Sequence, residues 1–335
     1  MGDKTDTETV SKRHIEGNPV KEPLNNPRIK YIFYFSAHGN PNDFKGLFDL
    51  IKDADVYVPE AFGWTIDYLD IYQDVSFGRK TPQQVVDVVQ AEGKDIDPLA
   101  LVELQALYNT RKQVVFVDLP QEEAIHTSGL FLGARNFDGL LRNVQHSLEG
   151  ECELNQKRDE RMVSHLMTRV VEVVKSNPDL NTKDDAIVVI SLGSVHTGVY
   201  HRLKDSGGYA ERIFDVIPQV YSYNEEGLRR MLWGKPVDDE LLARILLETA
   251  FGNVFRPELE RVTVDNAKID LYIRKAVSLF GIEKIREIFG SLIYTRWEYF
   301  KETFEDEMTH SLGTMGWWIP HSEAQMDRLL GDKLI

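Results

Sequence analysis

Short apolar runs alternate with amphipathic segments over the first two thirds of the chain. Runs rich in β-branched and aromatic residues, bounded by turn-forming residues, predict strands at Tyr31–Ser36, Asp55–Val58, Gln113–Asp118 and Ala186–Ser191. Helical spacing of apolar residues predicts helices at Asn42–Lys52, Pro82–Gln90, Pro98–Asn109 and Asp159–Lys175. This alternation predicts an α/β fold with a largely parallel or mixed central sheet flanked by helices.

The pattern changes after Asn224, where only helical spacing is found. The segments with that spacing are Glu225–Met231, Asp238–Phe251, Ala267–Phe289 and Arg296–Met308. We therefore expect three regions. Residues 1–27 are polar and aperiodic and predict a disordered or loosely docked arm. Residues 28–223 form the α/β core that carries the site, and residues 224–335 form a mainly helical C-terminal layer or subdomain.

Composition narrows the class of partner. The net charge of −15 disfavours nucleic acid and anionic membranes, which both select clustered Lys and Arg. The charged N-terminal segment has no apolar stretch of the signal-peptide kind, so we expect a cytoplasmic protein. Cys152 is the single cysteine, which excludes an intramolecular disulfide and a multi-cysteine metal site. We expect a small-molecule or peptide substrate and leave a homo-oligomer open.

Chemistry-bearing residues stand where the predicted strands end. His38 follows the first strand, Glu60 the second and His196 the fourth, while Asp118 closes the third. Because the carboxyl ends of parallel strands meet at one edge of a sheet, we expect these side chains to share a site. Two imidazoles with one or two carboxylates suit a hydrolytic transition metal completed by water. The alternative is that each is structural, the histidines as hydrogen-bonded residues and the acids as helix caps or turn formers.

Two other kinds of site are disfavoured. The segment Gly193–Gly198 has the spacing of a phosphate loop, but Val199 and Tyr200 follow where Lys and Ser or Thr are required. No serine stands in the GxSxG context of a nucleophile elbow.

A family resemblance is carried by five segments in order: FSAH, PE, VD, RDERM and GSVHTG. Together they resemble the TraB/Tiki superfamily, whose broader group includes erythromycin esterase-like and ChaN-like proteins. That family pattern has a GxxH after the first strand, a Glu after the second, an Arg in an RN or RD motif and a second GxxH. His38, Glu60, Arg158 and His196 hold these positions, within roughly Tyr31 to Leu203.

The resemblance is incomplete in two places. Phe35 stands where the first motif has Gly, and Leu119 follows Asp118 where many members read DR. The first departure favours an alternative in which the chain keeps the fold as a small-ligand-binding or interaction protein without catalysis.

The resemblance implies a metal-dependent hydrolase of the peptidase or esterase type. His38, Glu60 and His196, with Asp118 as a further ligand, would hold a divalent Mn, Co or Zn ion that lowers the pKa of a bound water. Glu60 would otherwise be the general base, and a metal-free version would use His38 and Glu60 for proton transfer. Arg158, expected at the start of the predicted helix, would orient a substrate carboxylate or stabilise an oxyanion.

Overall fold

Five parallel strands form the centre of the α/β lobe. The computed structural model describes residues 28–36, 45–91, 93, 96–123, 134–214, 222–293 and 297–331. The strands are β1 (Arg28–Ser36), β2 (Val56–Val58), β3 (Gln113–Val114), β4 (Asp185–Gly193) and β5 (Tyr209–Phe214). Their order in the sheet is β3-β2-β4-β1-β5, and every pairing is parallel. The predicted α/β fold with a largely parallel sheet is confirmed, whereas the arm 1–27 and His38 lie outside the described residues.

Side chains alternate between the two faces of the sheet, and helices cover both. Tyr34, Tyr57 and Val189 face one layer. This layer contains α1 (Lys45–Asp53), α2 (Ile66–Ser76), α3 (Pro82–Ala91) and α4 (Pro98–Leu107). Phe33 and Val188 face the other layer. That layer is built by the end of α5 (Phe137–His165), the π-helical turn η3 (Leu166–Val170), α6 (Val171–Ser176), α7 (Pro178–Asn181) and α8 (Thr197–Asp205).

Helix α5 is much longer than the sequence pattern predicts. It begins at Phe137, where the side chain of Asn136 accepts a hydrogen bond from the Gly139 N–H at 2.8 Å, and it runs through the expected start at Asp159. Arg158 therefore lies well inside a helix, and its expected place at a helix N-terminus is wrong. The inward stripe of α5 carries polar residues, including Asn155 and Arg158, which hides the helical period from a hydrophobicity pattern.

The C-terminal part of the described chain is helical, as predicted. It contains α9 (Tyr223–Leu232), α10 (Asp239–Val262), α11 (Asn266–Ser278), α12 (Ile282–Leu292), α13 (Trp297–Thr314) and α14 (Glu323–Leu330). The segment Ala267–Phe289, expected to be helical, is divided between two helices, because the chain turns at Gly281, the N-cap of α12. These helices pack round α10 into a second core that also takes in Leu140 and Leu148 from the first half of α5.

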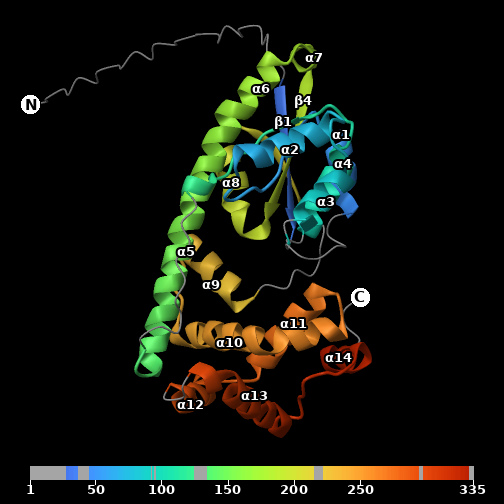
Figure 1. Cartoon of the computed structure of the whole chain (residues 1–335). Helices are drawn as coiled ribbons and strands as arrows, with labels where there is room; N and C mark the ends of the chain where they lie inside the picture. The colour runs from blue at the N-terminus through green and yellow to red at the C-terminus, as the bar shows by residue number, and fades with distance from the viewer. Residues whose placement is uncertain are drawn as a thin grey trace, which may run out of the picture.

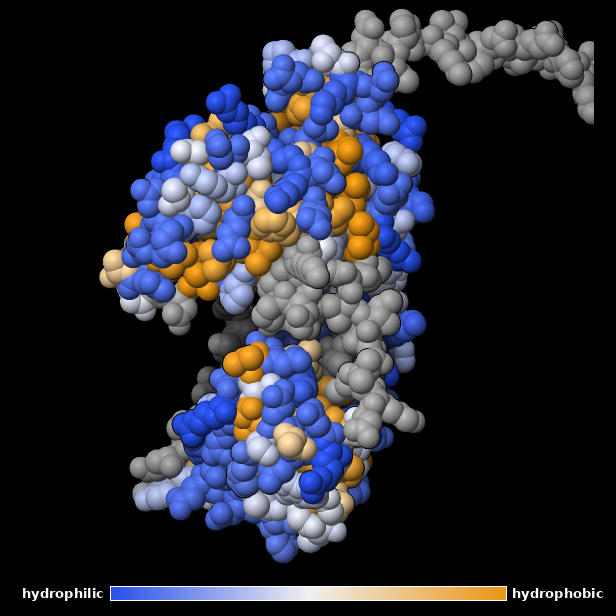
Figure 2. Space-filling view, turned by 90° about the vertical axis from the view of Figure 1, so that its right-hand side faces the viewer, coloured by the Kyte–Doolittle hydropathy of each residue, from blue (hydrophilic) through white to orange (hydrophobic). Residues whose placement is uncertain are grey.

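The two lobes lie one above the other along α5, and the carboxyl end of β1 points toward the helical lobe (Figure 1). The surface is deeply notched between the lobes (Figure 2). Across the part of the chain that the structure describes, no helix combines the length and apolar character needed to cross a membrane.

Candidate active site

Four of the sequence-predicted site residues meet at the carboxyl edge of the sheet. Glu60 follows β2, Asp118 follows the segment that continues β3, and His196 ends the short helix η4 (Ser194–His196) after β4. Arg158 reaches them from α5. The fifth, His38, lies outside the described residues.

Arg158 binds two carboxylates at once. Its Nε donates to Asp118 Oδ1 at 3.1 Å, and its Nη2 donates to Asp118 Oδ2 and to Glu60 Oε1, both at 2.6 Å. Burial disfavours the charged guanidinium, but the hydrogen bonds and charges of the two carboxylates outweigh it and raise the pKa of Arg158. This forked pairing fixes the position of Glu60 as well as neutralising charge. Arg158 is not a surface cation, since the residue is only 9% exposed.

Asp118 is fully buried and accepts hydrogen bonds from Arg158 with both carboxylate oxygens. Besides Arg158, its Oδ1 accepts the N–H of Leu119 at 2.7 Å. The Asp118 carbonyl accepts from Trp64 Nε1 at 3.0 Å, which anchors the residue to the segment after Glu60. On the opposite side, His165 Nδ1 lies 3.1 Å from the Val117 carbonyl and ties α5 to the same strand end.

Glu60 is the carboxylate between two buried cations. Its Oε2 accepts the Gly193 N–H at 2.5 Å, and its Oε1 accepts from Arg158 and lies 3.4 Å from His196 Nε2. The side chain of Glu60 is 13% exposed, against 0% for Asp118. Of these two carboxylates, Glu60 is therefore the one that solvent or a ligand can reach.

His196 is fully buried and faces a carboxylate on each side. Its Nδ1 lies 2.7 Å from Asp159 Oδ1, and its Nε2 points toward Glu60 without making a hydrogen bond to any described residue. Burial opposes protonation, but the carboxylates of Glu60 and Asp159 outweigh it and raise the pKa of His196 to about 9. The ring is an imidazolium at neutral pH, so the cluster holds three carboxylates and two cations.

Asp159 is the site residue that sequence reasoning missed. It is 4% exposed and makes the direct contact to His196. The available signal is Gly198, two residues after His196. A Cβ at this position would stand 2.5 Å from Asp159 Oδ2, so only glycine lets the carboxylate lie against α8.

Arg158 joins two of the predicted metal ligands, Glu60 and Asp118. The guanidinium of Arg158 already lies between the two carboxylates, and both Asp118 oxygens accept its hydrogen bonds. Within the described ranges no group of three His, Cys, Asp or Glu side chains could hold an ion. The wider set that includes His38 stays a prediction.

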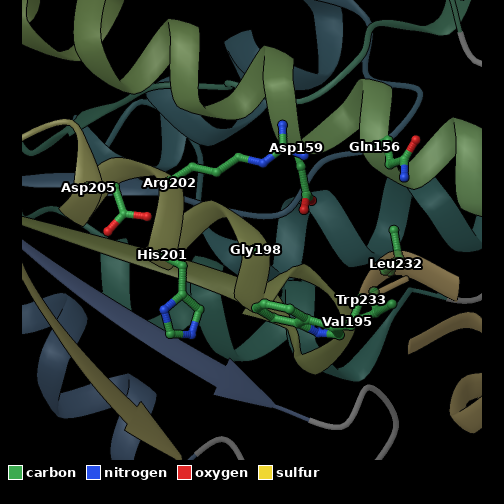
Figure 3. Close-up of a pocket in the computed structure, with 9 residues that line it drawn as sticks. All are labelled: Gln156, Asp159, Val195, Gly198, His201, Arg202, Asp205, Leu232 and Trp233. Carbon is green, nitrogen blue, oxygen red and sulfur yellow. The ribbon is translucent and has the colours of Figure 1, made fainter. Parts of the chain in front are cut away.

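Hollows lie on both sides of the charge network. On the Glu60 side, two adjacent hollows of about 390 and 250 Å³ share Glu60, Phe62 and Tyr68 in their walls, and together they are called here the Glu60 cleft. On the other side, a hollow of about 220 Å³ lies between α5, α8 and the end of α9. There Asp159 points from α5 toward Gly198, with Trp233 and His201 nearby (Figure 3).

Comparisons with protein-family models, with curated proteins and with solved structures gave no match to this chain. The resemblance to the TraB/Tiki superfamily therefore stays a prediction.

Proposed function

We propose that this protein is a hydrolase that cleaves an ester or amide bond in a small-molecule or peptide substrate, with Glu60 as its general base. The observation that carries the proposal is the position of this carboxylate. It stands at the carboxyl edge of a parallel sheet, on the wall of a cleft, between the buried cations of Arg158 and His196. Ligand sites of open α/β sheets lie at this edge.

The chemistry follows from that position. Glu60 takes a proton from a water molecule in the cleft while the water oxygen adds to the substrate carbonyl carbon. The protonated Glu60 then returns that proton to the leaving oxygen or nitrogen as the carbonyl carbon releases it, which restores the carboxylate. Nε and Nη2 of Arg158 are taken up by Asp118 and Glu60. Its Nη1 is the nitrogen we assign to the developing oxyanion.

The remaining members of the network position Glu60. His196 is fully buried and acts through Glu60 rather than on the substrate. Asp159 keeps its imidazolium oriented, and the Gly193 N–H holds the second Glu60 oxygen. A divalent Mn, Co or Zn ion enters this proposal only through His38 and would supply a more acidic water.

The test compares Glu60→Gln with Glu160→Gln, a substitution of the same kind at an exposed position on α5. Wild type and both variants are screened against p-nitrophenyl esters and chromogenic peptides, and their metal content is measured by elemental analysis. We expect Glu60→Gln to lower kcat at least about a hundredfold and Glu160→Gln to leave it unchanged. Equal activity in all three proteins would contradict the assignment. A folded wild type without activity on any substrate would favour the non-catalytic, ligand-binding alternative.

Metal content separates the two versions of the mechanism. Activity that survives chelation in metal-free protein supports the version in which Glu60 acts on water directly. About one equivalent of Mn, Co or Zn, lost together with activity in His38→Ala, would support the version that includes His38.

A further inference from the structure

We propose that the Glu60 cleft binds an organic cation, an alkylammonium group, which on the proposed function is part of the substrate. The inference names the substrate class of that function, but binding of the cation can be measured without turnover. It rests on the aromatic lining, the charge and the rigidity of the cleft.

The lining of the Glu60 cleft is aromatic. Phe62, Trp64, Tyr68 and Tyr72 all contribute to its walls. Aromatic faces attract cations, and an alkylammonium group gains from this attraction because it is weakly hydrated. The wall already shows the interaction once, since the guanidinium carbon of Arg158 lies 4.6 Å from the centre of the Phe62 ring.

The charge of the lining has one sign. Glu60, Asp97 and Glu103 are its ionisable acids, and no Lys or Arg is found among the described residues that line the cleft. Apart from Arg158 Nη1, which the proposed mechanism assigns to the oxyanion, an anionic substrate group would find no cationic partner at these walls, whereas a cation finds both carboxylates and ring faces.

The aromatic walls are held rigidly. The Tyr68 ring meets the Tyr72 ring at 5.2 Å and the Phe116 ring at 5.5 Å, and Trp64 packs edge-on against Phe116 at 5.6 Å. The Tyr72 hydroxyl donates to buried Glu103 at 2.6 Å. Rigid rings lose little conformational entropy when a ligand binds, which suits a preformed site.

The cleft is also joined to the proposed chemistry. Trp64 donates its indole N–H to the carbonyl of Asp118, whose side chain holds Arg158. A cation seated against Trp64 and Tyr68 would therefore place the rest of the substrate beside Glu60, one of the three residues that both hollows share.

The test measures binding of choline and of its uncharged shape analogue, 3,3-dimethylbutan-1-ol, by isothermal titration calorimetry and ligand-observed NMR. We expect choline to bind at least about tenfold more tightly than the alcohol. Tyr68→Ala should weaken choline about fivefold, from the loss of one cation–π contact, while Tyr68→Phe keeps the ring and the affinity. Tyr299→Ala, which removes an exposed ring on α13, is the matched control.

Several results would overturn the inference: equal binding of both compounds, no binding of either, or choline affinity that Tyr68→Ala leaves unchanged. These results are independent of the function. Choline binding by a protein that hydrolyses nothing would refute the proposed function alone. Hydrolysis of neutral esters with no preference for cations would refute this inference alone.

Discussion

At the scale of single residues, the site depends on how buried charges are matched. Arg158 occupies the place between Glu60 and Asp118 where the sequence pattern suggested a metal ion. A guanidinium in that place satisfies both carboxylates by directed hydrogen bonds. Removing any one member would leave a buried charge without its partner, which costs far more than the pair contributes by itself.

A substitution at Gly198 tests how closely Asp159 and His196 pack against α8. Gly198→Ala would bring a Cβ to 2.5 Å from Asp159 Oδ2 and push that carboxylate away from His196. We expect a loss of roughly 1 to 3 kcal/mol in the free energy of unfolding, although alanine is normally the better helix former. Urea denaturation of the variant and wild type, followed by circular dichroism, measures the loss.

Two comparisons make that result specific. Gly252→Ala on α10, where an added Cβ meets no atom within 4 Å, should be neutral or stabilising by up to about 1 kcal/mol. In an Asp159→Ala background the cost of Gly198→Ala should disappear, since the clashing oxygen is gone. An undiminished cost in the double variant would contradict the packing argument.

At the scale of elements, buried strands were predictable and edge elements were not. β1, β2 and β4 follow the predicted runs because they are apolar on both faces. β5 was missed because its six residues, YAERIF, include Glu211 and Arg212 at the open edge of the sheet. β3 has two ladder residues instead of the predicted six, although Val115 to Val117 remain buried.

The site residues also divide into those that could be predicted from the sequence and those that could not. Glu60, Asp118 and His196 could be predicted because a strand end in a parallel sheet fixes where a side chain emerges. Asp159 could not, because its role depends on the tertiary approach of α5 to α8, and a charged residue in a polar stretch reads as solvent-exposed. His38 follows the same strand-end logic and stays a prediction.

At this scale, the carboxyl group that holds the start of α9 makes the stability of the protein depend on pH. Glu248 on α10 accepts the N–H groups of Tyr223 at 2.6 Å and Asn224 at 3.2 Å. Burial raises the pKa of Glu248 to about 7, and these two N–H donors offset only part of the shift. In the unfolded chain the pKa has its ordinary value near 4.5. The folded state therefore binds more protons between these two values, and stability should fall as pH rises from about 4.5 to 7.

The substitution Glu248→Gln removes that titration while keeping an oxygen for the N–H groups. The free energy of unfolding of the variant minus that of wild type should be larger at pH 8 than at pH 5.5, by on the order of 2 kcal/mol. Urea unfolding at both pH values provides the measurement. Glu240→Gln, at a half-exposed position on the same helix, controls for the general loss of a carboxylate. A difference in the free energy of unfolding between Glu248→Gln and wild type that does not change with pH would contradict the raised pKa of Glu248.

At the scale of the whole molecule, α5 belongs to both hydrophobic cores. Leu140 and Leu148 pack into the helical lobe, and Met162 packs beneath the sheet. Between them the same helix carries Arg158 and Asp159 into the site. A second link joins Ser194, beside His196, to Glu225 of α9 by a hydrogen bond of 2.9 Å. The position of the site residues on α5 is thus set by packing in both lobes.

This sharing predicts that the two lobes unfold together. Leu148→Ala removes a side chain that is 1% exposed in the helical core, and Met162→Ala removes a fully buried one in the α/β core. Each should cost about 2 to 5 kcal/mol. Because a continuous helix would have to fray or break for one lobe to open alone, each substitution should destabilise both lobes.

Native-state hydrogen exchange, followed separately on β4 and on α10, reports the stability of the two lobes. Leu148→Ala should then lower protection in β4 as much as in α10, and Met162→Ala should lower it in α10 as much as in β4. Protection lost only in the lobe that carries the substitution would show instead that the lobes are separate folding units and that α5 can break between them.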